Sequence, residues 1–207
     1  MAKKRFYLSI DMDFWNDIDD EQIDSLKKSL SDLIGKAKRL KIPIHAVVSH
    51  HQLLNFVNRT RFNQLINIDY HSDLADKRTK VLNCGTWLSY VANRRKSQYV
   101  WYHNSILKHG ECNGRKRIFR RKGVNKSLSD WKSLKHIQST EMPTINLNNC
   151  VGIGLVLSPD YSYNCLKVLF YKLIKKYKIK LHQGRYANDE YRKKITIKDF
   201  LKQGGVL

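Results

Sequence analysis

The chain has 207 residues, of which 42% are hydrophobic and 11% aromatic, and these values suit one globular domain with a substantial core. No stretch approaches the roughly 20 apolar residues of a membrane span, and no signal-peptide core follows the start, so we expect a cytoplasmic protein without membrane contact. The four cysteines (Cys84, Cys112, Cys150 and Cys165) are scattered, which argues against a disulfide framework or a zinc finger.

The charge balance is unusual, because the formal net charge is +21 whereas small domains usually stay in single digits. A surface of this kind predicts an anionic partner, with DNA or RNA as the first candidate, since Lys and Arg neutralise phosphates and release counterions. The alternative is that the charge only keeps the protein soluble. Nothing in the sequence indicates an oligomeric state.

The first half of the chain alternates between strand and helix patterns. Residues 5–14 form a β-rich run, and an amphipathic helix follows, with an acidic first turn and apolar residues at helical spacing. A second strand over residues 42–48 leads to a helix that starts at Ser49 or His50, and a third strand covers residues 65–70. This βαβαβ order predicts an α/β fold of three layers, with a mainly parallel sheet flanked by helices.

The second half has a less regular pattern. We expect a helix over residues 87–95, a short aromatic strand over 99–103 and a basic loop excursion at about 108–126. A last strand over residues 150–157 precedes a helix over 161–177, whose basic C-terminal end suits the helix dipole. The tail after His182 is polar, and its pattern predicts no particular element.

Acids and histidines follow each of the first three strands. These residues are Asp11, Asp13, His50, His51, Asp69, His71 and Asp73. If the three strands lie side by side in a parallel sheet, their carboxyl ends share one edge, and side chains two apart in an extended segment point the same way. Mixed carboxylate and imidazole ligation suits Mn²⁺, Fe²⁺ or Zn²⁺. For each motif alone, the alternative is a capping residue or a solvated turn.

These motifs resemble those of the arginase and agmatinase (ureohydrolase) superfamily. Residues 69–73 (D-Y-H-S-D) resemble its D-A-H-x-D motif, and residues 9–13 (S-I-D-M-D) resemble its S-x-D-x-D motif. The strongest similarity is to an uncharacterised arginase-like family in which V-V-x-D-H-Q precedes D-S-H-P-D-L. The similarity covers about residues 5–95, with an echo at 152–160. Because the two acidic motifs occur in reversed order, the resemblance implies a circularly permuted arginase-like fold over residues 1–207.

The resemblance also implies a pair of divalent metal ions, with Mn²⁺ expected first and Fe²⁺ or Zn²⁺ as alternatives. In the family pattern Asp11 and Asp69 bridge the ions. His51 and Asp73 complete one site, and His71 and Asp13 complete the other. A water held between two cations loses its proton near neutral pH, so the implied reaction is C–N bond hydrolysis. Candidate general acids for the leaving amine are His50, His103 and His109.

The choice of substrate follows from charge and from one departure. Val156 occupies the place of the family's guanidinium-binding Glu, and a positive surface repels cationic substrates, so an anionic or nucleic-acid-associated substrate fits better. Basic and aromatic residues mix in residues 96–103 and 115–122, as in phosphate contacts with base stacking. The alternative for these segments is the aromatic core of a strand beside a solvated loop. The alternatives are a metal-dependent nuclease, or a module that binds nucleic acid or a host protein on a degenerate arginase-like scaffold.

Overall fold

The computed structural model describes residues 4–16, 19–71, 73, 85–104, 131–159 and 161–182. The expected basic excursion at about residues 108–126 and the polar tail after His182 lie outside these ranges. Among the described residues, no helix has both the length and the apolar character needed to cross a membrane.

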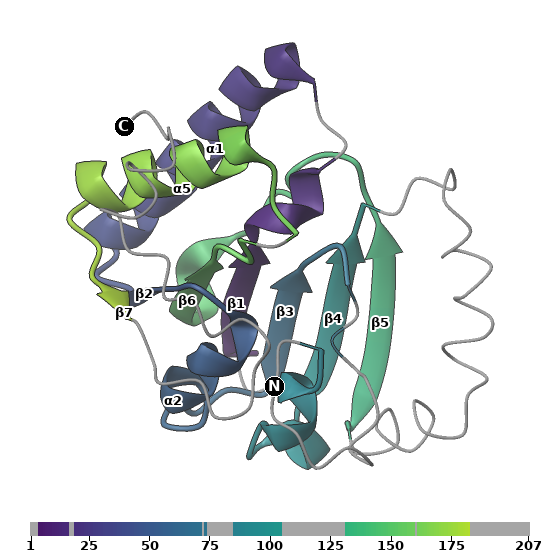
Figure 1. The fold of residues 1–207 in the computed structure, drawn as a ribbon. Coiled ribbons are helices and arrows are strands. Elements are labelled where there is room, and N and C mark those ends of the chain that lie inside the picture. Colours follow the sequence, from purple (N-terminus) through teal and green to yellow (C-terminus); the bar gives the residue numbers. More distant parts are fainter. Residues whose placement is uncertain are drawn as a thin grey trace, which may run out of the picture.

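In the described part of the chain, a sheet of seven strands, parallel in every pairing, forms the centre of the fold, in the order β5-β4-β3-β1-β6-β2-β7 (Figure 1). The strands are β1 (Phe6–Asp11), β2 (Ile44–Val47), β3 (Gln64–Ile68), β4 (Gln98–His103), β5 (Ser133–Gln138), β6 (Cys150–Val156) and β7 (Leu181–His182). The expected three-layer α/β fold with a parallel sheet is confirmed.

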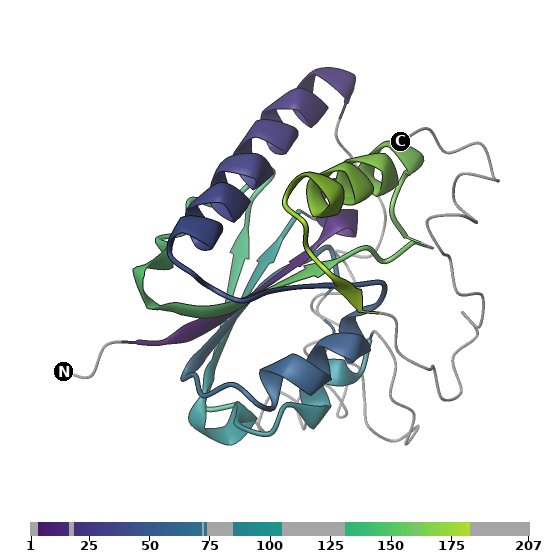
Figure 2. The same cartoon turned by 90° about the vertical axis from the view of Figure 1, so that its left-hand side faces the viewer.

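Helices cover both faces of this sheet, as the edge-on view in Figure 2 shows. The long helices α1 (Asp20–Arg39) and α5 (Asn164–Lys176) lie on one face. The other face carries α2 (Leu54–Val57) and the short 3₁₀ helices η2 (His50–Leu53), η4 (Trp87–Tyr90) and η5 (Arg94–Lys96). Two further 3₁₀ turns are η1 (Met12–Trp15) and η6 (Leu147–Asn149).

The pleat of β1 explains the two-sided core. All six residues of this strand are buried. Leu8 and Ile10 pack in the cluster that contains the apolar faces of α1 and α5, whereas Tyr7 packs with Leu53 and Trp87 in the cluster on the opposite face. Alternate residues of a strand point to opposite faces, so this central strand supplies both halves of the core.

Four details differ from the sequence-based expectations. Strand β6 lies between β1 and β2, so the first three strands are not all neighbours. The run over residues 5–14 ends early, because the Asp11 carboxylate accepts a hydrogen bond from the Asp13 amide and caps η1. The expected helix over residues 87–95 consists of the 3₁₀ helices η4 and η5. Strands β5 and β7 were not predicted.

Candidate metal centre

The carboxyl edge of the sheet gathers the acidic and imidazole side chains. Asp11 ends β1, Asp69 follows β3, and His50 begins η2 just after β2. Each of Asp11, Asp13 and His50 exposes 1% of its surface, Asp69 is fully buried and Asp73 exposes 5%. The side chain of His71 is 41% exposed. The strand ends therefore place a charged cluster inside the protein, with His71 on its solvent side.

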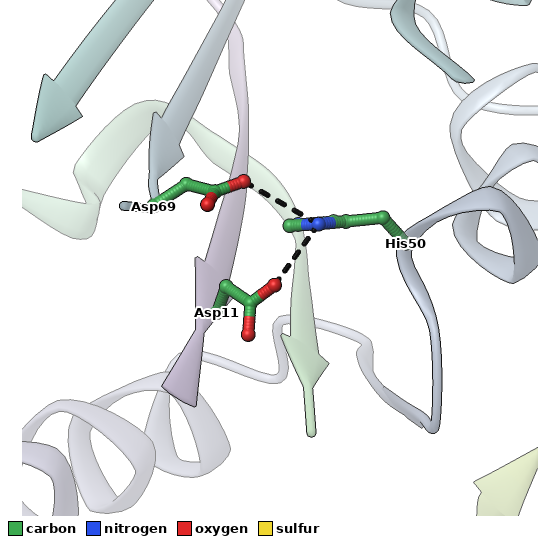
Figure 3. Close-up of side chains that lie close together, drawn as sticks. All are labelled: Asp11, His50 and Asp69. Carbon is green, nitrogen blue, oxygen red and sulfur yellow. Dashed lines mark ion pairs between the residues drawn. The ribbon is translucent and has the colours of Figure 1, made fainter. Parts of the chain in front are cut away.

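His50 lies at the centre of one group of ligand atoms. Its Nδ1 is 3.1 Å from Asp11 Oδ2, 3.4 Å from Asp69 Oδ2 and 3.0 Å from Asp73 Oδ2. Figure 3 shows Asp11 and Asp69 directed at this ring from two neighbouring strands. The three carboxylates thus converge on one point, which His50 Nδ1 occupies.

A second group shares Asp69 with the first. His71 Nδ1 is 3.1 Å from Asp13 Oδ2 and 4.0 Å from Asp69 Oδ1. The two carboxylate oxygens of Asp69 therefore face different imidazoles. Ligand atoms in each of the triads Asp11–His50–Asp69 and Asp13–Asp69–His71 lie within 4.8 Å of one another, a spacing at which each triad could hold a metal ion.

Neutral donors hold the three carboxylate oxygens that face His50. Ser158 Oγ donates to Asp11 Oδ2 at 2.5 Å, Asn67 Nδ2 to Asp69 Oδ2 at 3.0 Å, and Trp87 Nε1 to Asp73 Oδ2 at 2.6 Å. The other nitrogen of His50, Nε2, lies 3.0 Å from Ser9 Oγ. These four residues are not among those expected from the sequence to act at the site. Ser9 and Ser158 fall within matched motifs, but Asn67 and Trp87 carry no sequence signal.

Burial and mutual repulsion shift the pKa values of the acids. Burial, followed by the charge of Asp11, raises the pKa of Asp13 to about 6, although His71 opposes this shift. Burial, followed by Asp73 and Asp13, raises the pKa of Asp69 well above its ordinary value. Because the ionised acids are costly here, the cluster attracts protons or other cations.

The imidazoles show the complementary shift. Burial lowers the pKa of His50, but the charges of Asp73, Asp11 and Asp69 outweigh it and raise the pKa well above the ordinary value. Burial also lowers the pKa of His71, yet its hydrogen bond to Asp13 and that residue's charge raise it to about 9. Without metal, the two histidines therefore act as the cations of the cluster.

Four of the six predicted ligands, Asp11, Asp13, Asp69 and His71, belong to the two triads, and His51 belongs to neither. His50 joins the carboxylates, whereas His51 is half-buried with Nδ1 3.1 Å from Ser49 Oγ. Successive side chains of a 3₁₀ helix point about 120° apart, so the neighbouring histidines of η2 leave the helix in different directions. His50 was expected as a general acid; the structure instead puts it among the ligand atoms.

Of the other two candidate general acids, only His103 lies among the described residues. His103 ends β4 as a fully buried residue whose ring packs against Trp101 and His136 at centroid distances of 4.5 and 5.9 Å. It belongs to neither triad. His109 lies outside the described residues.

The donor set fits a divalent cation. Buried carboxylates are stable only when cations or hydrogen bonds balance them, and oxygen with imidazole nitrogen is the ligand mixture of borderline metals.

Comparisons of the chain with models of protein families, with curated proteins and with solved structures found no match. The fold and the site therefore define an α/β protein with a buried Asp/His cluster that could bind a metal ion.

Proposed function

We propose that the chain is a metal-dependent hydrolase of the arginase-like type, which activates water at a two-metal centre for hydrolysis of a C–N bond. The observation that carries this proposal is the shared position of Asp69, whose two oxygens face separate imidazole–carboxylate groups. A carboxylate between two ligand groups is the arrangement that a pair of ions needs. Mn²⁺ is the metal we propose, because oxygen-rich sites favour it.

Each ion would have its own set of ligands, and Asp69 would belong to both sets. Asp11, His50, Asp69 and Asp73 would hold one ion, and Asp13, Asp69 and His71 the other. Divalent ions held there would supply Lewis acidity and lower the pKa of water. The surrounding burial excludes bulk solvent from the carboxylates, and the exposed His71 marks the side from which substrate reaches the centre.

The substrate we propose is anionic. Val156 lies beside Asp11 in the sheet register, fully buried within the apolar cluster that contains Leu53. It offers no carboxylate to a guanidinium group, so this position does not support arginine or agmatine as substrate. A net charge of +21 further favours an anion, including an amide-bearing group on a nucleotide or nucleic acid.

The same charge favours a second candidate, a metal-dependent nuclease. Paired metals also support in-line displacement at phosphorus, and the basic composition suits a polyanionic substrate. Cleavage of DNA or RNA that requires Mn²⁺ or Mg²⁺ would favour this candidate over C–N hydrolysis.

Metal content and the variant Asp69→Asn test the proposal. We expect about two Mn²⁺ ions per chain by elemental analysis, and a large rise in melting temperature when Mn²⁺ is added, since an ion bound only to the native state stabilises it by mass action. Asp69→Asn removes the shared charge but nearly keeps the shape, so it should lose the hydrolytic activity and most of the Mn²⁺-dependent rise. Its metal-free melting temperature should equal or exceed that of the parent, because carboxylate repulsion is relieved.

The matched control is Asp24→Asn, the same change at an exposed position of α1 where the carboxylate pairs only weakly with Lys27 at 3.4 Å. This variant should bind metal like the parent. Less than about half an equivalent of metal in the parent, with no increase on Mn²⁺ addition, would overturn the metal centre and favour a binding module that uses the scaffold without catalysis.

A further inference from the structure

Trp87 touches two members of the cluster at once. Its Nε1 donates a hydrogen bond of 2.6 Å to Asp73 Oδ2, the oxygen that lies 3.0 Å from His50 Nδ1. Its ring also stacks on the His50 ring, with centroids 5.1 Å apart and planes 7° from parallel. This separation is within the range of an offset aromatic stack. One indole therefore fixes the direction of a carboxylate and the plane of an imidazole.

The indole is itself held in place by the core. Trp87 is fully buried and starts η4. It packs in the cluster that contains Tyr7, Leu53 and Trp101. Because this packing fixes the ring independently of His50 and Asp73, Trp87 can act as a rigid reference for both side chains.

Asp73 needs such a support more than the other acids do. Its φ is 51°, in the left-handed region that residues other than glycine seldom adopt. The acid also lies at no strand end, whereas Asp11 ends β1 and Asp69 directly follows β3. An indole N–H is a donor without acceptor capacity, so it can orient a carboxylate but cannot compete with it for a cation.

We propose that Trp87 is a positioning residue of the metal centre, which sets the orientation of Asp73 and His50 toward a divalent cation. This inference rests on the proposed metal centre. Groups that orient metal ligands from outside the coordination sphere commonly change metal affinity by 10- to 100-fold when they are removed. The orientation of Asp73 depends on the N–H group and is therefore separate from the packing role of Trp87, whereas the orientation of His50 depends on the stacked ring.

The test compares Trp87→Phe with Trp131→Phe. Phe keeps an aromatic ring but has no N–H donor. Trp131 is 4% exposed in the same apolar cluster and packs against Tyr99 at 5.3 Å, and its Nε1 has no hydrogen-bond partner among the described residues. Both changes remove the same volume from the same core, but only the first removes a donor to a carboxylate.

Calorimetric titration with Mn²⁺ should show at least about a tenfold loss of affinity in Trp87→Phe and a change below about threefold in Trp131→Phe. Both variants should lose thermal stability without metal. Equal affinities of parent and Trp87→Phe would overturn the positioning role, as would equal losses of affinity in the two variants.

A second readout uses the parent chain and needs no stable variant. In protein with ¹⁵N-labelled tryptophan, one of the four indole N–H resonances should show nuclear Overhauser contacts to the His50 ring and shift on addition of Zn²⁺, which is diamagnetic. If the parent binds no ion at all, the proposed function fails. The positioning of His50 is then judged by its ¹⁵N ring signals in protein with ¹⁵N-labelled histidine. Signals that change in Trp87→Phe but not in Trp131→Phe support the role, and signals unchanged in both overturn it.

Discussion

At the scale of single residues, positive φ angles occur both at ordinary helix ends and at the candidate site. Lys41 and Lys178 have φ angles of 56° and 49°, and each follows the capping residue of a long helix, where a left-handed residue commonly ends the helix. Ser158 and Asp73, with φ angles of 45° and 51°, follow no such helix. Within the candidate centre, Ser158 donates a hydrogen bond to Asp11, and Asp73 accepts one from Trp87. Strained backbone of this kind often occurs at functional sites.

The variants Ser158→Gly and Ser158→Ala separate the backbone strain from the hydrogen bond to Asp11. Both lose the donor, but glycine adopts positive φ without the steric cost that alanine retains. We expect Ser158→Gly to be more stable than Ser158→Ala by about 1 kcal/mol, measured by urea unfolding of the metal-free protein. Both variants should bind Mn²⁺ more weakly than the parent. If Ser158→Ala is the more stable of the two, strain at this residue is not significant.

At the scale of elements, two glycines of β6 allow the apolar cluster that contains Tyr7 and Leu53, on one face of the sheet, to pack close to the strand. A Cβ on Gly152 would lie 2.6 Å from Cε2 of Tyr7, whose ring is fully buried. A Cβ on Gly154 would lie 2.6 Å from both Cδ atoms of Leu53 in η2. The glycines therefore leave room for large side chains beside the strand that separates β1 from β2.

Gly152→Ala should destabilise the protein by about 1–3 kcal/mol, because a rigid aromatic ring must move to admit the methyl group. The matched control is Gly35→Ala in α1, where the new Cβ would meet neighbouring atoms at 3.7 Å or more, an ordinary contact. Alanine in a helix interior is favoured over glycine by about 1 kcal/mol, so the control should raise the melting temperature. Thermal unfolding of both variants checks the opposite signs, and a stabilised Gly152→Ala would show that Tyr7 moves without cost.

How much of the fold could be predicted differs from element to element for physical reasons. The strand containing Leu8 and Ile10 is detectable because it is buried on both faces and therefore apolar. In contrast, β5 (Ser133–Gln138) has no buried residue and reads as a polar segment, so its pattern gives no strand signal. The position of β6 between β1 and β2 depends on long-range packing, which local periodicity does not encode.

Residues of the candidate site could be predicted where their positions at strand ends bring them together. They could not be predicted where the rotation of a helix or tertiary packing determines which side chain faces the site. The parallel sheet brings Asp11 and Asp69 to one edge, as expected from their positions at strand ends. The choice between His50 and His51 depends on how η2 turns after β2, and a one-residue shift there reverses it. The donors Asn67 and Trp87 reach the site only through tertiary packing, so no motif could identify them.

At the scale of the whole molecule, the net charge of +21 contrasts with a centre that is rich in carboxylates. The described acids of the cluster are buried, and the net charge already counts them as ionised, so the field of the whole chain remains positive. Such a field speeds the approach of anions and repels cations. The proposed polyanionic partner is consistent with this field, and the densest basic segment, residues 115–122, lies outside the described residues.

Salt dependence tests whether that segment contacts phosphates. One variant replaces by Gln six basic residues of the segment: Arg115, Lys116, Arg117, Arg120, Arg121 and Lys122. The control replaces six exposed lysines of α1 and α5: Lys27, Lys28, Lys36, Lys38, Lys172 and Lys175. Both lose the same charge, but only the first should flatten the plot of log affinity for single-stranded DNA against log salt, by as much as about 4 for six contacts at roughly 0.7 each. Equal flattening in both would indicate a diffuse field without a defined patch. Phosphate contacts are strongest at low salt. Undetectable binding at about 50 mM salt would therefore show that the charge serves solubility and not nucleic-acid binding.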